Sequence, residues 1–198
     1  MPPIALTDEL TAVVAAYATM AAVHAGVGQV VDVSLLDSLF SFMGHNWAAY
    51  AGDGTLQPRM GSELPYSVPR NTYRSADGHW LALSASADTV AARVARLVGL
   101  GDDERFGTFA GRVEHRAELD AAVASFIGAR TRAEAVAAFE QADAAIAPIH
   151  SMADVATDPH FLERESMVTV DGVGMPRCSP ASPRRPAVRW AGRDGTAQ

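Results

Sequence analysis

The chain has 198 residues, which is enough for one large domain or for one and a half small ones. A hydrophobic fraction of 48% can supply a core, and a formal net charge of -7 argues against nucleic acid or an anionic membrane as a partner. A lone cysteine, Cys178, excludes a disulfide within the chain, so we expect a cytoplasmic protein.

The N-terminal part of the sequence predicts a helix, a strand and a second helix. MPPIALTDEL lacks the pattern of a signal peptide, and no stretch approaches about 18 apolar residues, so neither export nor a membrane span is expected. Helical spacing runs from Thr7, the predicted N-cap, to Gly26, the predicted stop, with Asp8 and Glu9 in the first turn. QVVDVSL then predicts a short strand, and LDSLFSFMGHNWAAYAG predicts one helix.

The rest of the chain predicts a mixture of hairpins and helices. Gly and Pro are frequent over residues 51–71, which indicates a linker. NTYRSADGHWLALSA predicts a hairpin with its turn at Asp77-Gly78. Further elements are expected in this order: helices at about 87–99, 116–129 and 132–142, a buried strand in AAIAPIH, helices on both sides of Asp158-Pro159, and a hairpin in MVTVDGVGMP. Val188 and Trp190 are the main apolar anchors of the tail.

Most candidate sites are better explained by structural roles. Gly26-Val27-Gly28 follows a helix and precedes a strand, the reverse of the order in a dinucleotide fingerprint, so it predicts a turn. The six histidines lack the spacing of metal ligands, so no metal is expected. No G-x-S-x-G motif is present, and Cys178 has no motif around it, which favours a structural thiol.

Asp8 admits two interpretations. An acid in the first turn of a helix stabilises the helix through the dipole by a few tenths of a kcal/mol, up to ~1 kcal/mol. The same carboxylate could act as a nucleophile, with nearby backbone N–H groups holding a substrate.

Four segments resemble the family III CoA-transferases, the group of formyl-CoA transferase and carnitine CoA-transferase. GQVVDVSLLDSLFSFM is similar to the G-Q-x-V-D-V-S-L-x-D segment of the family, and PRNTYRSADGHWLALSA is similar to its Y-x-T-x-D-G-x-W segment. AFEQADAAIAPIHSMADVATDPHF and MPRCSPASPRRPAVRWAG follow in the family's order. The resemblance covers nearly the whole chain.

The resemblance implies a reaction and one catalytic residue. In the family, an Asp that opens the helix before G-Q attacks an acyl-CoA to form a mixed anhydride. An aspartyl-CoA thioester follows, and an acceptor carboxylate then takes the CoA. LTDELTAVVAAYATMAAV puts Asp8 at that position. The implied ligands are coenzyme A, as acyl-CoA substrate, and a carboxylic acid, with no metal.

The resemblance also implies that this chain is a C-terminal portion. Family members are roughly twice as long, and their N-terminal half supplies most contacts to CoA, so CoA-binding residues cannot be assigned here. An interlocked homodimer, or a heteromer with an N-terminal half, is implied. The sequence GSELPYSVPRN stands where some transferases have a mobile glycine loop.

Two alternatives remain open at this point. The chain could be a non-catalytic or truncated paralogue that acts as a binding subunit. It could also resemble the α-methylacyl-CoA racemases of the same superfamily, which use a Glu shortly after the hairpin. Ala87 stands at that position and weighs against a racemase.

The expected fold class is α/β: part of a family III large domain plus a small α+β domain. The large domain would contribute a helix-strand-helix at the N-terminus and a returning segment at the C-terminus. The predicted limits are 1–55 for the nucleophile segment, 56–70 for a linker, 71–147 for the small domain and 148–198 for the return.

Overall fold

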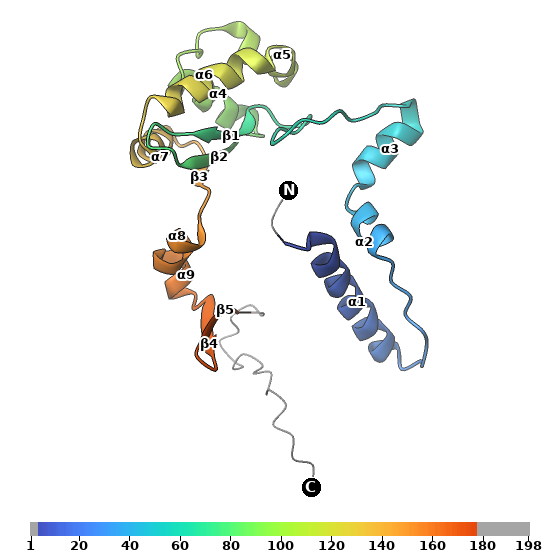
Figure 1. The fold of residues 1–198 in the computed structure, drawn as a ribbon. Coiled ribbons are helices and arrows are strands. Elements are labelled where there is room, and N and C mark those ends of the chain that lie inside the picture. The colour runs from blue at the N-terminus through green and yellow to red at the C-terminus, as the bar shows by residue number, and fades with distance from the viewer. Residues whose placement is uncertain (1–3, 178–198) are drawn as a thin grey trace. The chain divides into compact units, whose positions relative to one another are not determined.

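The structure, a computed structural model, describes residues 4–177 of a mixed α/β chain. The chain divides into two units, Met1–Met60 and Gly61–Gln198, each of which is described by itself. The domain limits expected from the sequence stay a prediction. The elements, labelled in Figure 1, are α1 (Leu6–Ala25), α2 (Leu35–Ser41), α3 (Gly44–Asp53), β1 (Arg70–Arg74), β2 (Trp80–Ser84), α4 (Asp88–Leu97), η1 (Glu104–Phe106), α5 (Phe109–Glu114), α6 (Arg116–Gly128), α7 (Arg132–Gln141), β3 (Ile146–Pro148), α8 (Met152–Thr157), α9 (Pro159–Glu163), β4 (Met167–Val170) and β5 (Val173–Pro176).

Helix α1 begins earlier than predicted. The Glu9 amide already donates to the Ala5 carbonyl at 3.0 Å, so Ala5 is the N-cap and the prediction that Thr7 caps the helix is wrong. The acids Asp8 and Glu9 do lie in the first turn. Gly26 ends the helix in the left-handed conformation (φ +67°), which confirms the turn predicted for the two glycines.

The surface of α1 is apolar and exposed. None of its residues is buried, and Val13, Tyr17 and Met20 are each at least 66% exposed. By length and composition alone this helix could cross a membrane, because its many weakly apolar alanines add up, although polar residues interrupt every long apolar run in it. A helix that is apolar on most sides requires cover, from protein or from lipid.

The segment after α1 departs from two predictions. Residues 29–34, predicted as a strand, form no strand, because no described segment pairs with their backbone. The predicted second helix is two helices, interrupted at Phe42 and Met43. At this break the Phe42 and Met43 amides bond to carbonyls three residues back, which tightens the end of α2 before Gly44.

The second unit contains a three-stranded antiparallel sheet in the order β1-β2-β3. The predicted hairpin is confirmed: β1 pairs with β2, and Gly78 in the turn has a positive φ of +84°. Strand β3 is also confirmed, but it is not buried as predicted. Ala147 is exposed, because β3 is an edge strand and its outer face is open.

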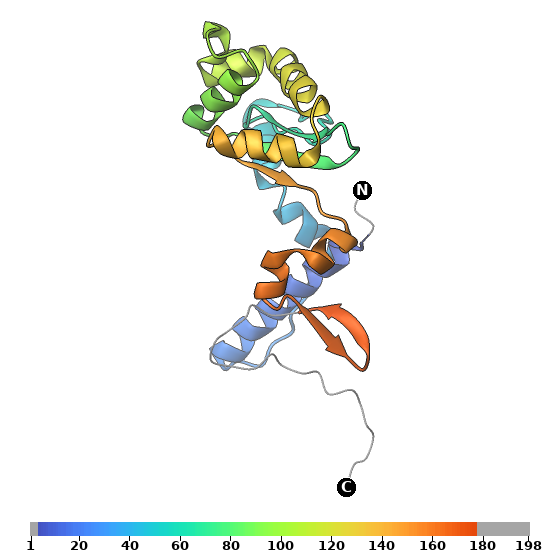
Figure 2. The ribbon, with the colours of Figure 1, turned by 90° about the vertical axis from the view of Figure 1, so that its left-hand side faces the viewer.

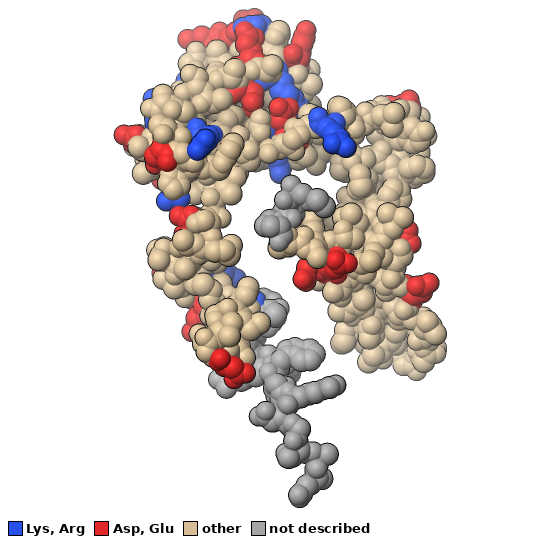
Figure 3. Space-filling view, viewed as in Figure 1, with Lys and Arg blue, Asp and Glu red and all other residues tan. Residues whose placement is uncertain are grey.

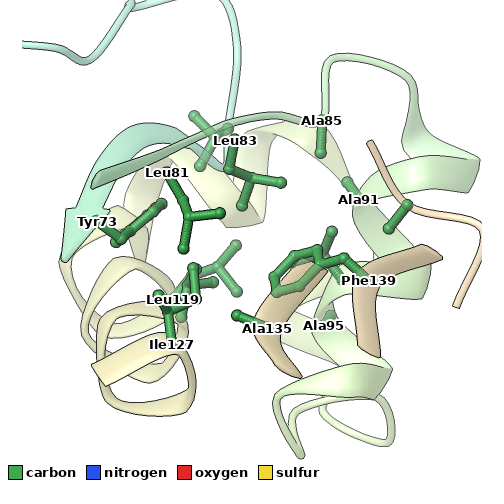
Figure 4. Close-up of a cluster of buried hydrophobic side chains, with 14 of the residues drawn as sticks. Tyr73, Leu81, Leu83, Ala85, Ala91, Ala95, Leu119, Ile127, Ala135 and Phe139 are labelled. Carbon is green, nitrogen blue, oxygen red and sulfur yellow. The ribbon is translucent and has the colours of Figure 1, made fainter. Parts of the chain in front are cut away.

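One face of the sheet packs against helices. The predicted helices are confirmed as α4, α6 and α7, whereas η1 and α5 were not predicted. Leu81 and Leu83 of β2 meet Leu119 and Ile127 of α6 and Phe139 of α7 in a cluster that excludes solvent (Figure 4). This core fixes the inward face of the sheet, and the helices of the described part of the second unit that build the core pack on this face.

The C-terminal part of the second unit is built from local elements. Helices α8 and α9 lie on the two sides of Asp158, which confirms the two helices predicted around Asp158-Pro159. The Asp158 carboxylate accepts from the His160 and Phe161 amides and so caps α9. The β4–β5 hairpin follows α9 along the chain (Figure 2) and turns at Asp171 and Gly172, both with positive φ. Cys178, Val188 and Trp190 lie outside the described residues.

Candidate active site

Asp8 is the third residue of α1, and its side chain is exposed. The N-cap, Ala5, offers no side-chain acceptor to the first turn. The backbone N–H groups at the start of α1 therefore have no side-chain cap, and a helix N-terminus attracts negative charge. The carboxylate thus stands in solvent beside donors that could bind an anion.

The helices around Asp8 carry little positive charge. The chain has no Lys or Arg before Arg59. In Figure 3 the visible face of α1, α2 and α3 is mostly uncharged with some acidic residues, whereas the basic side chains lie outside these helices. No Lys or Arg side chain of these three helices is therefore available to neutralise phosphate groups.

Two histidines of the second unit lie near carboxylates of the same unit. His115 lies 3.7 Å from Glu118, and His150 lies 4.0 Å from Asp158, each within its own part of the second unit. Among residues 4–177, no group of three His, Cys, Asp or Glu side chains forms a potential metal site.

The position aligned with the racemase Glu is a helix cap. Ala87 precedes α4 in an extended conformation. The neighbouring carboxylate, Asp88, pairs with the guanidinium of Arg112, which is fully buried. Arg112 also donates to the Val68 carbonyl at 3.0 Å and to the Phe106 carbonyl at 3.3 Å. Asp88 therefore belongs to a structural network.

The loop 61–69, where the resemblance implies a glycine-rich segment in some transferases, is held in place by five contacts. Arg112 binds the Val68 carbonyl, and Arg116 binds the Glu63 carboxylate at 3.4 Å and the Pro65 carbonyl at 3.3 Å. Hydroxyl pairs complete the set: Ser67 with Ser86 at 2.9 Å, and Thr72 with Ser62 at 3.2 Å. Five residues of the loop 61–69 are thus held by the rest of the second unit.

A second buried network connects β1 with α6. The Tyr73 hydroxyl donates to the Asp120 carboxylate at 2.6 Å, and the Asn71 amide donates to its other oxygen at 3.1 Å. Burial, followed by the hydrogen bond to Asp120, raises the pKa of Tyr73. Tyr73 therefore stays protonated near neutral pH and works as a donor that fixes the strand.

Sequence reasoning missed both networks. Arg112 lies in a short helix that was not predicted, and its partners are separated from it by as many as 44 residues along the chain. No local pattern marks such a pairing. The only available signal was the arginine itself, a residue that is rarely buried without partners.

The comparisons with known proteins point to one family. The model of CoA-transferase family III matches residues 1–192. The succinyl-CoA–D-citramalate CoA-transferase of Chloroflexus aurantiacus is 33% identical over 174 residues, covering 84% of this chain and 43% of the relative. The alpha subunit of the succinyl-CoA–L-malate CoA-transferase of the same organism is 27% identical, covering 76% of this chain and 36% of the relative. A beta subunit of that enzyme also matches, at 27% identity.

A solved structure extends the likeness to the fold. A CaiB/BaiF family protein from Brucella suis has a TM-score of 0.71 at 26% identity, covering 95% of this chain and 50% of that one. A mixed α/β family III architecture is thereby confirmed. The chain spans less than half the length of the curated relatives named above and half of the solved structure.

Proposed function

The chain belongs to CoA-transferase family III, and on this premise we propose that it takes part in moving CoA from an acyl-CoA to a carboxylic acid, with Asp8 as the nucleophile. The curated relatives are named for succinyl-CoA as donor and for citramalate or malate as acceptor. The proposed acceptor is therefore a small dicarboxylic acid, and the donor is a short acyl-CoA such as succinyl-CoA.

In the proposed reaction, an Asp8 oxygen attacks the thioester carbonyl, and CoA leaves as a thiolate. The thiolate then attacks the Asp8 carbonyl of the mixed anhydride, which releases the donor acid and leaves CoA on Asp8 as a thioester. The acceptor carboxylate attacks this thioester and expels the thiolate, which finally attacks the acceptor carbonyl. The products are a new acyl-CoA and the free Asp8 carboxylate, so no proton, water or metal is consumed.

The observation that carries the proposal is the family match across Asp8 and the helix that it opens. Two features of the residue are compatible with the role. Its carboxylate is exposed, and uncapped N–H groups at the start of α1 can stabilise negative charge that develops on a bound carbonyl oxygen.

We further propose that the active form contains additional polypeptide, resembling the first half of the relatives. Helix α1, which carries Asp8, and the next two helices, α2 and α3, have no Lys or Arg to bind the phosphates of CoA. The apolar surface of α1 is also exposed. An interlocked dimer or a heteromer would supply both; the alpha and beta subunits named for one relative are a precedent for two chains. A cytoplasmic location is proposed with it.

A trapping experiment tests the role of Asp8. The chain, alone and co-expressed with a polypeptide resembling the missing half, is incubated with succinyl-CoA and hydroxylamine, and its peptides are examined by mass spectrometry. An activated Asp8 ester or thioester reacts with hydroxylamine, so a hydroxamate is expected on the peptide containing Asp8. Asp8→Asn should abolish both this label and CoA transfer to malate.

Glu9→Gln is the matched control, since it removes the neighbouring acid of the same turn. Transfer that survives Asp8→Asn, or a hydroxamate on another residue, would remove Asp8 from the mechanism. If no pairing transfers CoA, the alternative holds: a non-catalytic paralogue that acts as a binding subunit. Epimerisation of a 2-methylacyl-CoA would instead indicate the racemase-like alternative, which Ala87 disfavours.

A further inference from the structure

The open face of the three-stranded sheet is hollow at its centre. Side chains alternate between faces along a strand, so the burial of Tyr73, Leu81 and Leu83 turns their neighbours outward. In the register of the sheet, Thr72 lies opposite Ala82, and Ala82 lies opposite Ala147. This row of small residues crosses all three strands, and it leaves a depression where larger side chains would fill the surface.

The depression is a pocket of about 350 Å³. Its floor comes from the small residues of the row, and its rim includes Arg70, Ser84 and Ser62. Arg70 lies opposite Ser84 in the register, one outward position along from the row. The volume is at the lower end of the range for small-molecule sites, about 300–1,000 Å³, so it suits a small organic acid and not a whole coenzyme.

The only charge that lines the pocket is positive. Arg70 is its single charged lining residue, and no Asp or Glu lines it. Within residues 4–177, the Arg70 guanidinium has no ion-pair or hydrogen-bond partner. The guanidinium groups of other arginines of the same unit are paired with carboxylates: Arg105, Arg112, Arg116 and Arg132. The Thr72 hydroxyl donates to Ser62, which leaves the Ser62 proton free to donate outward. An unpaired guanidinium beside free hydroxyl donors is the arrangement that binds an oxyanion.

We propose that this pocket binds a small carboxylate anion, held by Arg70 with Ser62 and Ser84 on the rim and the alanine floor against its carbon chain. Guanidinium also binds phosphate, but the pocket is too small for coenzyme A and mostly apolar below the rim. This binding requires only the second unit, so it holds whether or not Asp8 is a nucleophile.

The test is a titration of the full 198-residue chain, isotopically labelled, with L-malate or succinate and followed by amide chemical shifts in NMR. The Thr72, Ala82 and Ala147 amides should shift with saturation. Arg70→Gln should weaken binding about tenfold or more, because a charge-assisted hydrogen bond is lost. Arg96→Gln, which removes an exposed arginine of α4, is the matched control and should bind as the unaltered chain does.

A second variant tests the shape independently of charge. Ala82→Val keeps a good strand residue and fills the floor, so it should also prevent binding while the amide spectrum stays folded. Unchanged affinity in either Arg70→Gln or Ala82→Val would overturn the proposal. Saturable shifts with inorganic phosphate but not with malate or succinate would overturn the carboxylate assignment, and so would no shift with any of the three.

Discussion

Replacing Arg112 by Met should destabilise the second unit far more than replacing Asp88 by Asn, although the two side chains form one ion pair. Arg112 is fully buried, whereas the Asp88 side chain is 69% exposed. The pair therefore lies at the boundary between protein and water. The buried guanidinium is stabilised by hydrogen bonds to its two carbonyl partners, whereas the exposed carboxylate is stabilised mostly by water.

The contacts give the magnitudes. Arg112→Met leaves the Val68 and Phe106 carbonyls without the side chain that donates to them, at 3.0 and 3.3 Å. A buried group without a partner costs about 1–3 kcal/mol, so the loss is roughly 2–5 kcal/mol after allowance for the apolar packing of Met. Asp88→Asn keeps an acceptor oxygen near the guanidinium and should cost about 1 kcal/mol or less.

Urea unfolding followed by far-UV circular dichroism measures both variants. Arg112→Lys, which keeps the charge but not the planar fork, should fall between them. The effect of Asp88→Asn should shrink as salt is raised, because the carboxylate is exposed, and the effect of Arg112→Met should not. If Asp88→Asn proves as damaging as Arg112→Met, the ion pair and not the carbonyl contacts stabilises the loop before β1, and this reasoning is wrong.

Two further predictions concern other positions. The raised pKa of Tyr73 means that the fold retains this proton longer than the unfolded chain, so stability should fall as pH rises above about 10, the ordinary value. Tyr73→Phe removes this proton and should make the fall of stability above about pH 10 less steep, whereas an unchanged slope would exclude Tyr73 as the cause. Gly26→Ala places a side chain at φ +67° and should reduce the free energy of unfolding of α1 by roughly 1 kcal/mol, seen as a lower thermal midpoint of helix loss. Gly28→Ala, where φ is not positive, should have little effect.

Local sequence signals predicted the second unit well, because there the local preferences and the packing agree. Asp77-Gly78 favours a turn, and the alternation on either side of it matches a sheet whose inner face the helices cover. The Thr131 capping box likewise marks the start of α7 at Arg132, the position predicted. Short elements such as α5 cannot be predicted from apolar spacing, because six residues are too few to show a helical period.

The first unit was predicted less well, and the reason is physical. The alternation in QVVDVSL is a strand signal, but a strand requires a neighbouring backbone, and none of the described segments provides one. The helix predicted over residues 36–52 ignored Ser38 and Ser41, whose hydroxyls bond to carbonyls of the preceding turn and compete with a continuous helix. Apolar spacing alone did not show this interruption.

The contrast between the units bears directly on how Asp8 must be tested. In the second unit, Leu81, Leu119 and Phe139 are fully buried by residues of the same unit. In the first, Val13, Tyr17 and Met20 of the helix that Asp8 opens are exposed. If another polypeptide covers that surface in the active enzyme, its binding should lower the solvent exposure of α1 and raise CoA transfer by Asp8 in the same samples. Hydrogen exchange of the α1 amides, measured with and without the co-expressed polypeptide, should therefore slow in the same samples that gain CoA transfer. Gain of transfer without slower exchange would separate catalysis from the covering of α1.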